Sequence, residues 1–72
     1  MNNRRLLSEY YKTDGSCAQV FRVSSGDNSF YSITFSDPQG YSLAQEDYPH
    51  KALGFVEDAA ENWTLGIKLL LG

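Results

Sequence analysis

The feature that most constrains this chain is an apolar stripe in its last third. Six apolar side chains recur there at spacings of three or four residues, namely Leu53, Val56, Ala60, Trp63, Ile67 and Leu70. Residues three and four apart lie on one side of an α-helix, so this spacing predicts an amphipathic helix. Glu57, Asp58 and Glu61 lie off the stripe, and no Lys or Arg follows any of them four residues later. We therefore expect a helix that covers a core and exposes an acidic surface.

We expect this helix to begin near residue 48 and to run to about Leu70. Asp47 is a suitable N-cap, and Pro49 is tolerated in the first turn because its missing N–H needs no partner there. Residues 64–71 also alternate apolar and other side chains, so a fifth strand after a shorter helix is an alternative. The unbroken stripe favours the single long helix.

Three turn signals divide the first two thirds of the chain into four extended segments. Asp-Gly at 14–15 predicts a two-residue hairpin turn, and Gly-Asp-Asn at 26–28 predicts a three-residue loop. Asp-Pro-Gln-Gly at 37–40 has the residues that a type I turn prefers. Residues 4–12 form the first strand or, alternatively, a short helix. The prediction is a two-layer α+β fold, with an antiparallel β-meander of three to four strands packed on one C-terminal α-helix.

These loop lengths assign one face of the sheet to the core. Tyr31, Ile33 and Phe35 alternate with polar residues, which is typical of a half-buried strand. The predicted inward face contains Leu6, Tyr10, Cys17, Phe21, Val23, Tyr31, Ile33, Phe35, Tyr41 and Leu43. The opposite face, which no helix is expected to cover, contains Leu7, Glu9, Tyr11, Ala18, Val20, Arg22, Phe30, Ser32 and Thr34.

Length and charge narrow the class of protein. A chain of 72 residues with 42% apolar content predicts one folded domain, residues 1–72. The formal net charge is −3, and residues 23–72 contain seven acids against Lys51 and Lys68. Phosphate binding requires clustered cations, so we do not expect nucleic acid as a partner. One cysteine, no signal-peptide apolar segment and no membrane-length apolar run predict a cytoplasmic protein without membrane contact.

The sequence offers little for catalysis. His50 is the only histidine and Cys17 the only cysteine, and a Cys–His nucleophile requires the two in contact with a third orienting group. No spacing resembles a set of metal ligands, and the six glycines form no phosphate-binding loop. We therefore expect neither an enzyme nor a cofactor.

The remaining prediction is a small acidic protein that acts through protein–protein contact, as a regulator or an inhibitor. The candidate partner-binding residues are Glu57, Asp58 and Glu61 on the helix and Tyr11, Arg22 and Phe30 on the uncovered sheet face. The acids suit a basic partner, and the sheet residues are of types common at interfaces. One alternative is a nucleic-acid mimic that inhibits a basic nucleic-acid-binding protein. The other is a structural homo-oligomer, in its simplest form a homodimer, that pairs through the sheet face.

Overall fold

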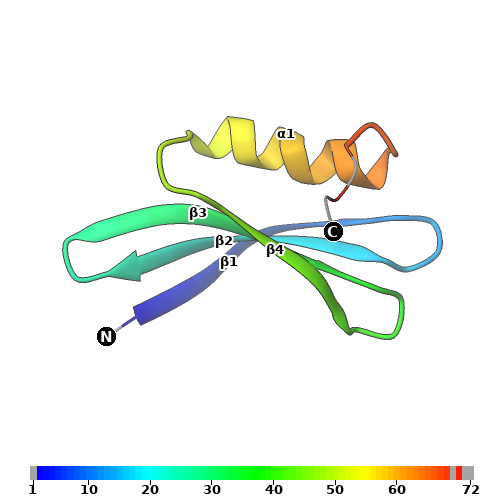
Figure 1. Ribbon diagram of the computed structural model, residues 1–72, viewed down its shortest axis with the longest axis horizontal. Coiled ribbons are helices and arrows are strands. Elements are labelled where there is room, and N and C mark those ends of the chain that lie inside the picture. The colour runs from blue at the N-terminus through cyan, green and yellow to red at the C-terminus, as the bar shows by residue number, and fades with distance from the viewer. Residues whose placement is uncertain (1, 69, 71–72) are drawn as a thin grey trace.

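The computed structural model describes residues 2–68 and residue 70 of the chain. Four strands precede one helix: β1 (Asn2–Tyr11), β2 (Cys17–Ser25), β3 (Asn28–Ser36), β4 (Ser42–Tyr48) and α1 (Leu53–Thr64). The strands form one antiparallel sheet in the order β1-β2-β3-β4, and α1 lies across one face of it (Figure 1). The predicted two-layer α+β fold is confirmed. The first segment is a strand rather than a helix.

The hydrophobic core lies between α1 and the sheet. Its buried side chains are Ala18, Val20, Ile33 and Phe35 from the strands and Val56, Ala60 and Trp63 from the helix. The ring centroids of Phe35 and Trp63 are 4.9 Å apart, and Tyr31 and Leu53 pack against the edge of this cluster. The predicted packing of β3 beneath the helical stripe is therefore confirmed.

The predicted orientation of β2 is wrong. Ala18 and Val20 face α1 and are fully buried, although both were expected on the uncovered face. Phe21 and Val23, which were expected in the core, lie on the opposite face because side chains alternate along a strand. Cys17 is buried, but it lies on that opposite face as well.

Two loop lengths explain why β2 is turned over although β3 is oriented as predicted. The first hairpin has a three-residue loop, in which the Lys12 N–H donates to the Ser16 carbonyl at 2.8 Å and Gly15 has a φ of 96°. The second hairpin has a two-residue loop, because Ser25 pairs with Asn28. The loop before β2 is one residue longer than predicted, and the loop after it is one residue shorter. The two differences cancel for β3, which keeps its predicted orientation. For β2, a shift of one residue exchanges the two faces.

Three more residues predicted in the core are exposed. The Asp37 N–H donates to the Tyr41 carbonyl at 2.9 Å, so Tyr41 lies beyond the end of β3 and not opposite Phe35. Leu43 is the extra residue of a β-bulge, and Tyr41 and Leu43 are 73% and 52% exposed. A second bulge, between Leu6 and Ser8, moves Leu6 to the uncovered face.

The helix begins later than predicted. β4 continues to Tyr48, so Asp47 is a strand residue and not a cap. Ala52 is the N-cap and makes no side-chain hydrogen bond there. The sequence pattern around Pro49 marks the turn that precedes α1, and not the first helical turn.

The helix also ends earlier than predicted. Gly66 has a φ of 80°, and the Ile67 N–H donates to the Asn62 carbonyl at 2.8 Å, which is the Schellman arrangement of a helix C-terminus. Ile67 is consequently 70% exposed, whereas Leu70 still packs against the core. For residues 64–71, neither the long helix nor a strand is found in the part that the structure describes; residues 69 and 71 lie outside it.

Candidate protein-binding surfaces

The face of the sheet opposite α1 has an apolar half. Leu6, Phe21, Val23 and Phe30 lie there side by side on β1, β2 and β3, and no described element crosses this face (Figure 1). Leu6 is 43% exposed and the other three are half-buried. The Arg4 guanidinium lies 4.1 Å from the centroid of the Phe21 ring. We call these five residues the apolar patch; aromatic and Arg side chains are the types that dominate binding energy at protein interfaces.

The other half of this face is polar and is held together by its own hydrogen bonds. Glu9 accepts a hydrogen bond from the Tyr11 hydroxyl at 2.7 Å and one from the Gln19 amide at 3.3 Å. Both bonds lower the pKa of Glu9. The hydrogen bond that Tyr11 donates to Glu9 is also the main reason that the pKa of the Tyr11 hydroxyl is raised to about 12. Burial raises the pKa of the Cys17 thiol beside them, which disfavours the reactive thiolate form.

A second carboxylate of this face, that of Asp47 beside the apolar patch, is also engaged in hydrogen bonds. The Ser32 hydroxyl, which is fully buried, donates to Asp47 Oδ1 at 2.7 Å, and the Gln45 amide donates to the same atom at 3.0 Å. The Gln45 bond, the Ser32 bond and the nearby charge of Arg4 lower the pKa of Asp47. Because the polar half satisfies its own groups, the apolar patch is the part of this face that gains most from a partner.

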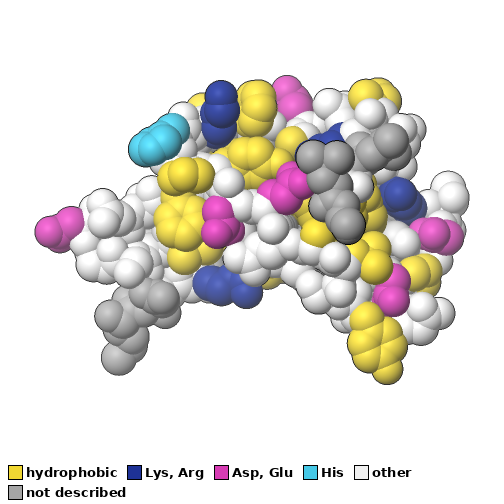
Figure 2. All heavy atoms as spheres, viewed as in Figure 1, with side chains coloured by type: hydrophobic (Ala, Val, Ile, Leu, Met, Phe, Trp, Pro, Cys, Tyr) yellow, Lys and Arg dark blue, Asp and Glu magenta, His cyan; other side chains and the backbone are white. Residues whose placement is uncertain are grey.

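The three acidic residues of α1 do not form one surface. Glu57 faces β1 and accepts a hydrogen bond from the Ser8 hydroxyl at 3.0 Å, whereas Asp58 lines a groove on the β4 side. Glu61 is exposed one turn after Glu57. Figure 2 shows acidic side chains scattered among apolar and basic ones on the visible face.

The predicted sheet residues are also divided. Tyr11 and Phe30 lie on the uncovered face, Tyr11 in its polar half and Phe30 in the apolar patch. Arg22 lies on the helix side of the sheet, where it pairs with Arg5 of β1 and Tyr31 of β3 and is exposed.

Sequence reasoning missed most of the apolar patch. Leu6, Phe21 and Val23 were expected in the core, and Arg4 was not singled out. The sequence feature that could have placed them is the length of the two loops around β2, because loop length sets the face of the sheet that each side chain occupies.

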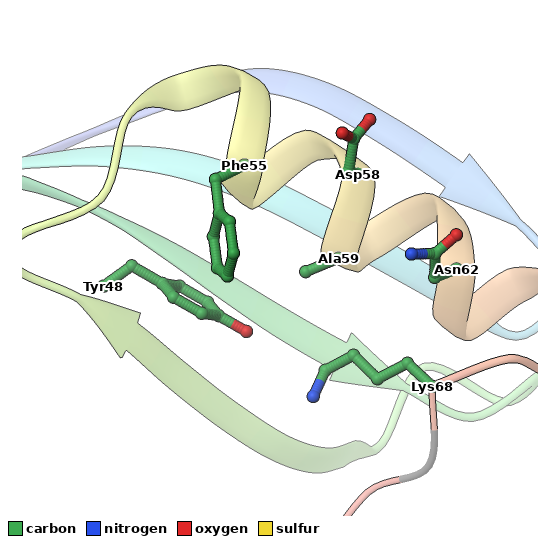
Figure 3. A pocket seen from close by; sticks show the side chains of 6 residues that line it. All are labelled: Tyr48, Phe55, Asp58, Ala59, Asn62 and Lys68. Carbon is green, nitrogen blue, oxygen red and sulfur yellow. The ribbon is translucent and has the colours of Figure 1, made fainter.

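A groove of about 430 Å³ lies between α1 and β4 (Figure 3). It is lined by Tyr48, Phe55, Asp58, Ala59, Asn62 and Lys68. The rings of Tyr48 and Phe55 meet edge to face with centroids 6.0 Å apart. The Tyr48 hydroxyl donates to Glu46 at 2.5 Å, and burial together with this bond raises the pKa of Tyr48. Sequence reasoning did not find this groove.

The described residues offer no arrangement for familiar chemistry. Among residues 2–68 and 70, no group of three His, Cys, Asp or Glu side chains is placed to hold a metal ion. Cys17 pairs with Ser36 at one end of the sheet, whereas His50 follows β4 at the other end. In the same part of the chain, no helix has both the length and the hydropathy to cross a bilayer.

Comparison with known proteins gave no relative. No family model, no curated protein and no solved structure matches the chain. The functional argument therefore depends on the geometry of this chain.

Proposed function

We propose that this chain is a small non-catalytic binding protein that acts through protein–protein contact at the uncovered face of its sheet. The observation that carries the proposal is the apolar patch, in which four apolar side chains and Arg4 are partly or fully open to solvent on a sheet whose other face is covered by α1. Contiguous apolar surface of this kind marks interaction sites. Contact with a partner would remove it from water at a gain of about 25 cal/mol per Å².

The proposed role is that of a regulator or an inhibitor in the cytoplasm. A protein that catalyses no reaction can change the activity of its partner by occupying the partner's surface. The buried free thiol of Cys17 suits a reducing compartment.

The test is capture of a partner from the native cytoplasm with paired variants. Leu6→Asp combined with Phe30→Asp places two charges in the apolar patch. Tyr41→Asp combined with Leu43→Asp makes the same kind of change at exposed positions of the third turn. We expect the patch variant to retain less than about a tenth of the partner that the wild type retains, and the control variant to match the wild type. Circular dichroism verifies that both variants fold. A patch variant that captures the partner as well as the control does would overturn the proposal.

Nucleic-acid mimicry is a second candidate. One observation favours it. Among the described residues the one ion pair joins Lys68 to Glu46, so Glu57, Asp58 and Glu61 have no cationic partner there. Changing these three residues to Lys would abolish binding by a mimic, and wild-type binding would weaken steeply with salt. Contact through the apolar patch predicts instead that binding survives the triple change.

A second copy of this chain is the third candidate partner. A structural homo-oligomer would bury the apolar patch of one protomer on the sheet face of another. Sedimentation at micromolar concentration distinguishes the cases, since a monomer at that concentration excludes this partner. A dimer that the Leu6→Asp and Phe30→Asp variant dissociates supports it.

A further inference from the structure

The sheet continues past the start of α1. The β2–β3 hairpin and the first residues of β1 extend beyond the first turn of the helix, and no described element lies above the helix-facing side there (Figure 1). Ala18 and Val20 of β2 are fully buried beneath α1, whereas Arg22, the next residue on the same side, is exposed. The covered part of this side therefore ends between Val20 and Arg22.

Two arginines lie side by side on this open end. Arg5 of β1 is the direct cross-strand partner of Arg22 of β2, and both are exposed; we call them the arginine pair. Directly opposed residues have Cβ atoms about 4.5–5.5 Å apart, so both guanidinium groups can reach one small ligand. Neither arginine makes any of the hydrogen bonds, ion pairs or cation–π contacts described for residues 2–68 and 70. Within that part of the chain, two positive charges face the same open space without a counterion.

The groups next to the arginine pair are hydrogen-bond donors. The neighbouring row toward the hairpin loop adds an amide and two hydroxyl groups, those of Asn3, Ser24 and Ser29. Tyr31 of β3 is the cross-strand partner of Arg22 on the other side of β2. The first turn of α1 contains no acidic residue.

The acids around this end are few, and one of them is adjacent. Asp27 is in the loop of the β2–β3 hairpin, at least about 10 Å along β2 from the arginine pair. Glu46 is on β4, two strands away, and its carboxylate lies 3.1 Å from Lys68 Nζ. Glu57 of α1 lies one row away, where it accepts a hydrogen bond from the Ser8 hydroxyl at 3.0 Å. The arginine pair thus outweighs the one carboxylate beside it.

We propose that the arginine pair binds the phosphate group of a phosphate monoester. One guanidinium group already satisfies both oxygens of a carboxylate through two parallel hydrogen bonds. Two guanidinium groups with hydroxyl groups nearby match a ligand with three terminal oxygens and a charge near −2, as a phosphate monoester has at pH 7. The site is on the other side of the sheet from the apolar patch, and the inference does not depend on the proposed function.

Phenyl phosphate is the probe, and its binding to the full chain is followed by amide chemical shifts at pH 7.5 and low salt. We expect saturable shifts centred on Arg5 and Arg22, with a Kd of about 1 mM or tighter. Benzoate, which has two oxygens, and diphenyl phosphate, which has one charge, should bind about fivefold more weakly or less.

A second probe, capped phosphoserine, distinguishes the two sources of such a group. Tighter binding than that of phenyl phosphate assigns the site to a phosphorylated side chain, and weaker binding assigns it to a small ester. Both results support a phosphate site at the arginine pair.

Matched variants separate the arginine pair from the overall charge. Arg5→Gln and Arg22→Gln each remove one guanidinium group, and Lys12→Gln removes one positive charge beyond the other end of β1. We expect each arginine variant to weaken the binding of phenyl phosphate about fivefold or more, and Lys12→Gln to change it less than twofold. Glu57→Gln removes the adjacent carboxylate, keeps an acceptor for Ser8, and should tighten binding about twofold. Circular dichroism verifies that all four variants fold.

Four results would overturn the inference. They are shifts that stay linear up to about 10 mM phenyl phosphate, shifts centred away from the arginine pair, benzoate that binds as tightly as phenyl phosphate, and a Lys12→Gln variant that weakens binding as much as the arginine variants do.

Discussion

The two faces of this sheet differ in the size of their side chains and in what they leave open. On the covered side, the core combines two small residues, Ala18 of β2 and Ala60 of α1, with larger ones, and all its residues are essentially buried. The uncovered face carries Phe21 and Phe30 without a partner layer, and Arg4 lies over one of these rings. The comparison teaches that the core of this small domain is one-sided. Substitutions on the covered face should change stability, and those on the uncovered face should change contact with partners.

The largest expected difference between the faces is that between two phenylalanines. Phe35→Ala removes a fully buried ring that meets Trp63, so we expect a loss of about 3–5 kcal/mol in the free energy of unfolding. Phe21→Ala, on the uncovered face, should cost about half of that or less because the ring is already partly exposed. Urea unfolding at pH 7 measures both. Equal costs would mean that the two faces are equally buried.

A second pair tests how closely α1 approaches the covered face. Ala18→Leu adds volume beneath the helix, and overpacking is expected to cost about 1–3 kcal/mol in the free energy of unfolding. Val23→Leu enlarges an apolar side chain of the same strand on the uncovered face, where no described element packs over it, and should change stability by less than about 0.5 kcal/mol. Thermal unfolding followed by circular dichroism compares the two. A neutral Ala18→Leu would contradict close packing of α1 on β2.

The hydrogen bonds of Asp47 on the uncovered face predict a pH dependence of stability. The pKa of Asp47 is lowered from its ordinary value of 3.8, so the native hydrogen bonds stabilise the fold above about pH 4, and this contribution is lost as the pH falls through the lowered value. Ser32→Ala removes one of these bonds and should cost about 1 kcal/mol at pH 7.

The same variant should lose less stability than the wild type between pH 7 and pH 3, because its Asp47 has a pKa closer to the ordinary value. Ser29→Ala, an exposed serine of the same strand, is the control and should follow the wild-type curve. Urea unfolding measured across this pH range would contradict the prediction if the wild-type and Ser32→Ala curves ran parallel.

The smallest expected effect concerns Arg4. Arg4→Gln removes the cation from the Phe21 ring and the hydrogen bond to Thr34 Oγ1, and we expect a loss of about 0.5 kcal/mol in the free energy of unfolding. Arg5→Gln has the same chemistry at the adjacent exposed residue and should be neutral within the error of chemical unfolding. A neutral Arg4→Gln would show that the Arg4–Phe21 contact adds nothing to stability and serves only the patch.

Much of the fold could be predicted because periodicity encodes it. The alternation at Tyr31, Ile33 and Phe35 and the spacing of Leu53, Val56 and Trp63 each match one kind of element, and these residues do face one another. The end of α1 was misjudged because the apolar pattern continues past Gly66. The positive φ of that glycine stops the helix.

The orientation of β2 could not be read from its own residues. This strand is apolar on both sides, with Ala18 and Val20 on one and Phe21 and Val23 on the other. Its face therefore depends on loop length, and Asp-Gly at 14–15 fits either a two-residue or a three-residue loop. The apolar patch was hidden for this reason. The groove was hidden because it depends on α1 packing over three of the four strands, which no local pattern encodes.

The most direct test of the one-sided core compares Val20 and Val23, two valines of β2 on opposite faces. Methyl signals of both are recorded with a soluble paramagnetic agent, together with nuclear Overhauser effects to Val56 of α1. The structure predicts that Val20, which lies in the same buried cluster as Val56, shows effects to the helix and is shielded from the agent, and that Val23 is broadened and shows no effect to the helix. Contact between Val23 and Val56, with Val20 exposed to the agent, would contradict the account.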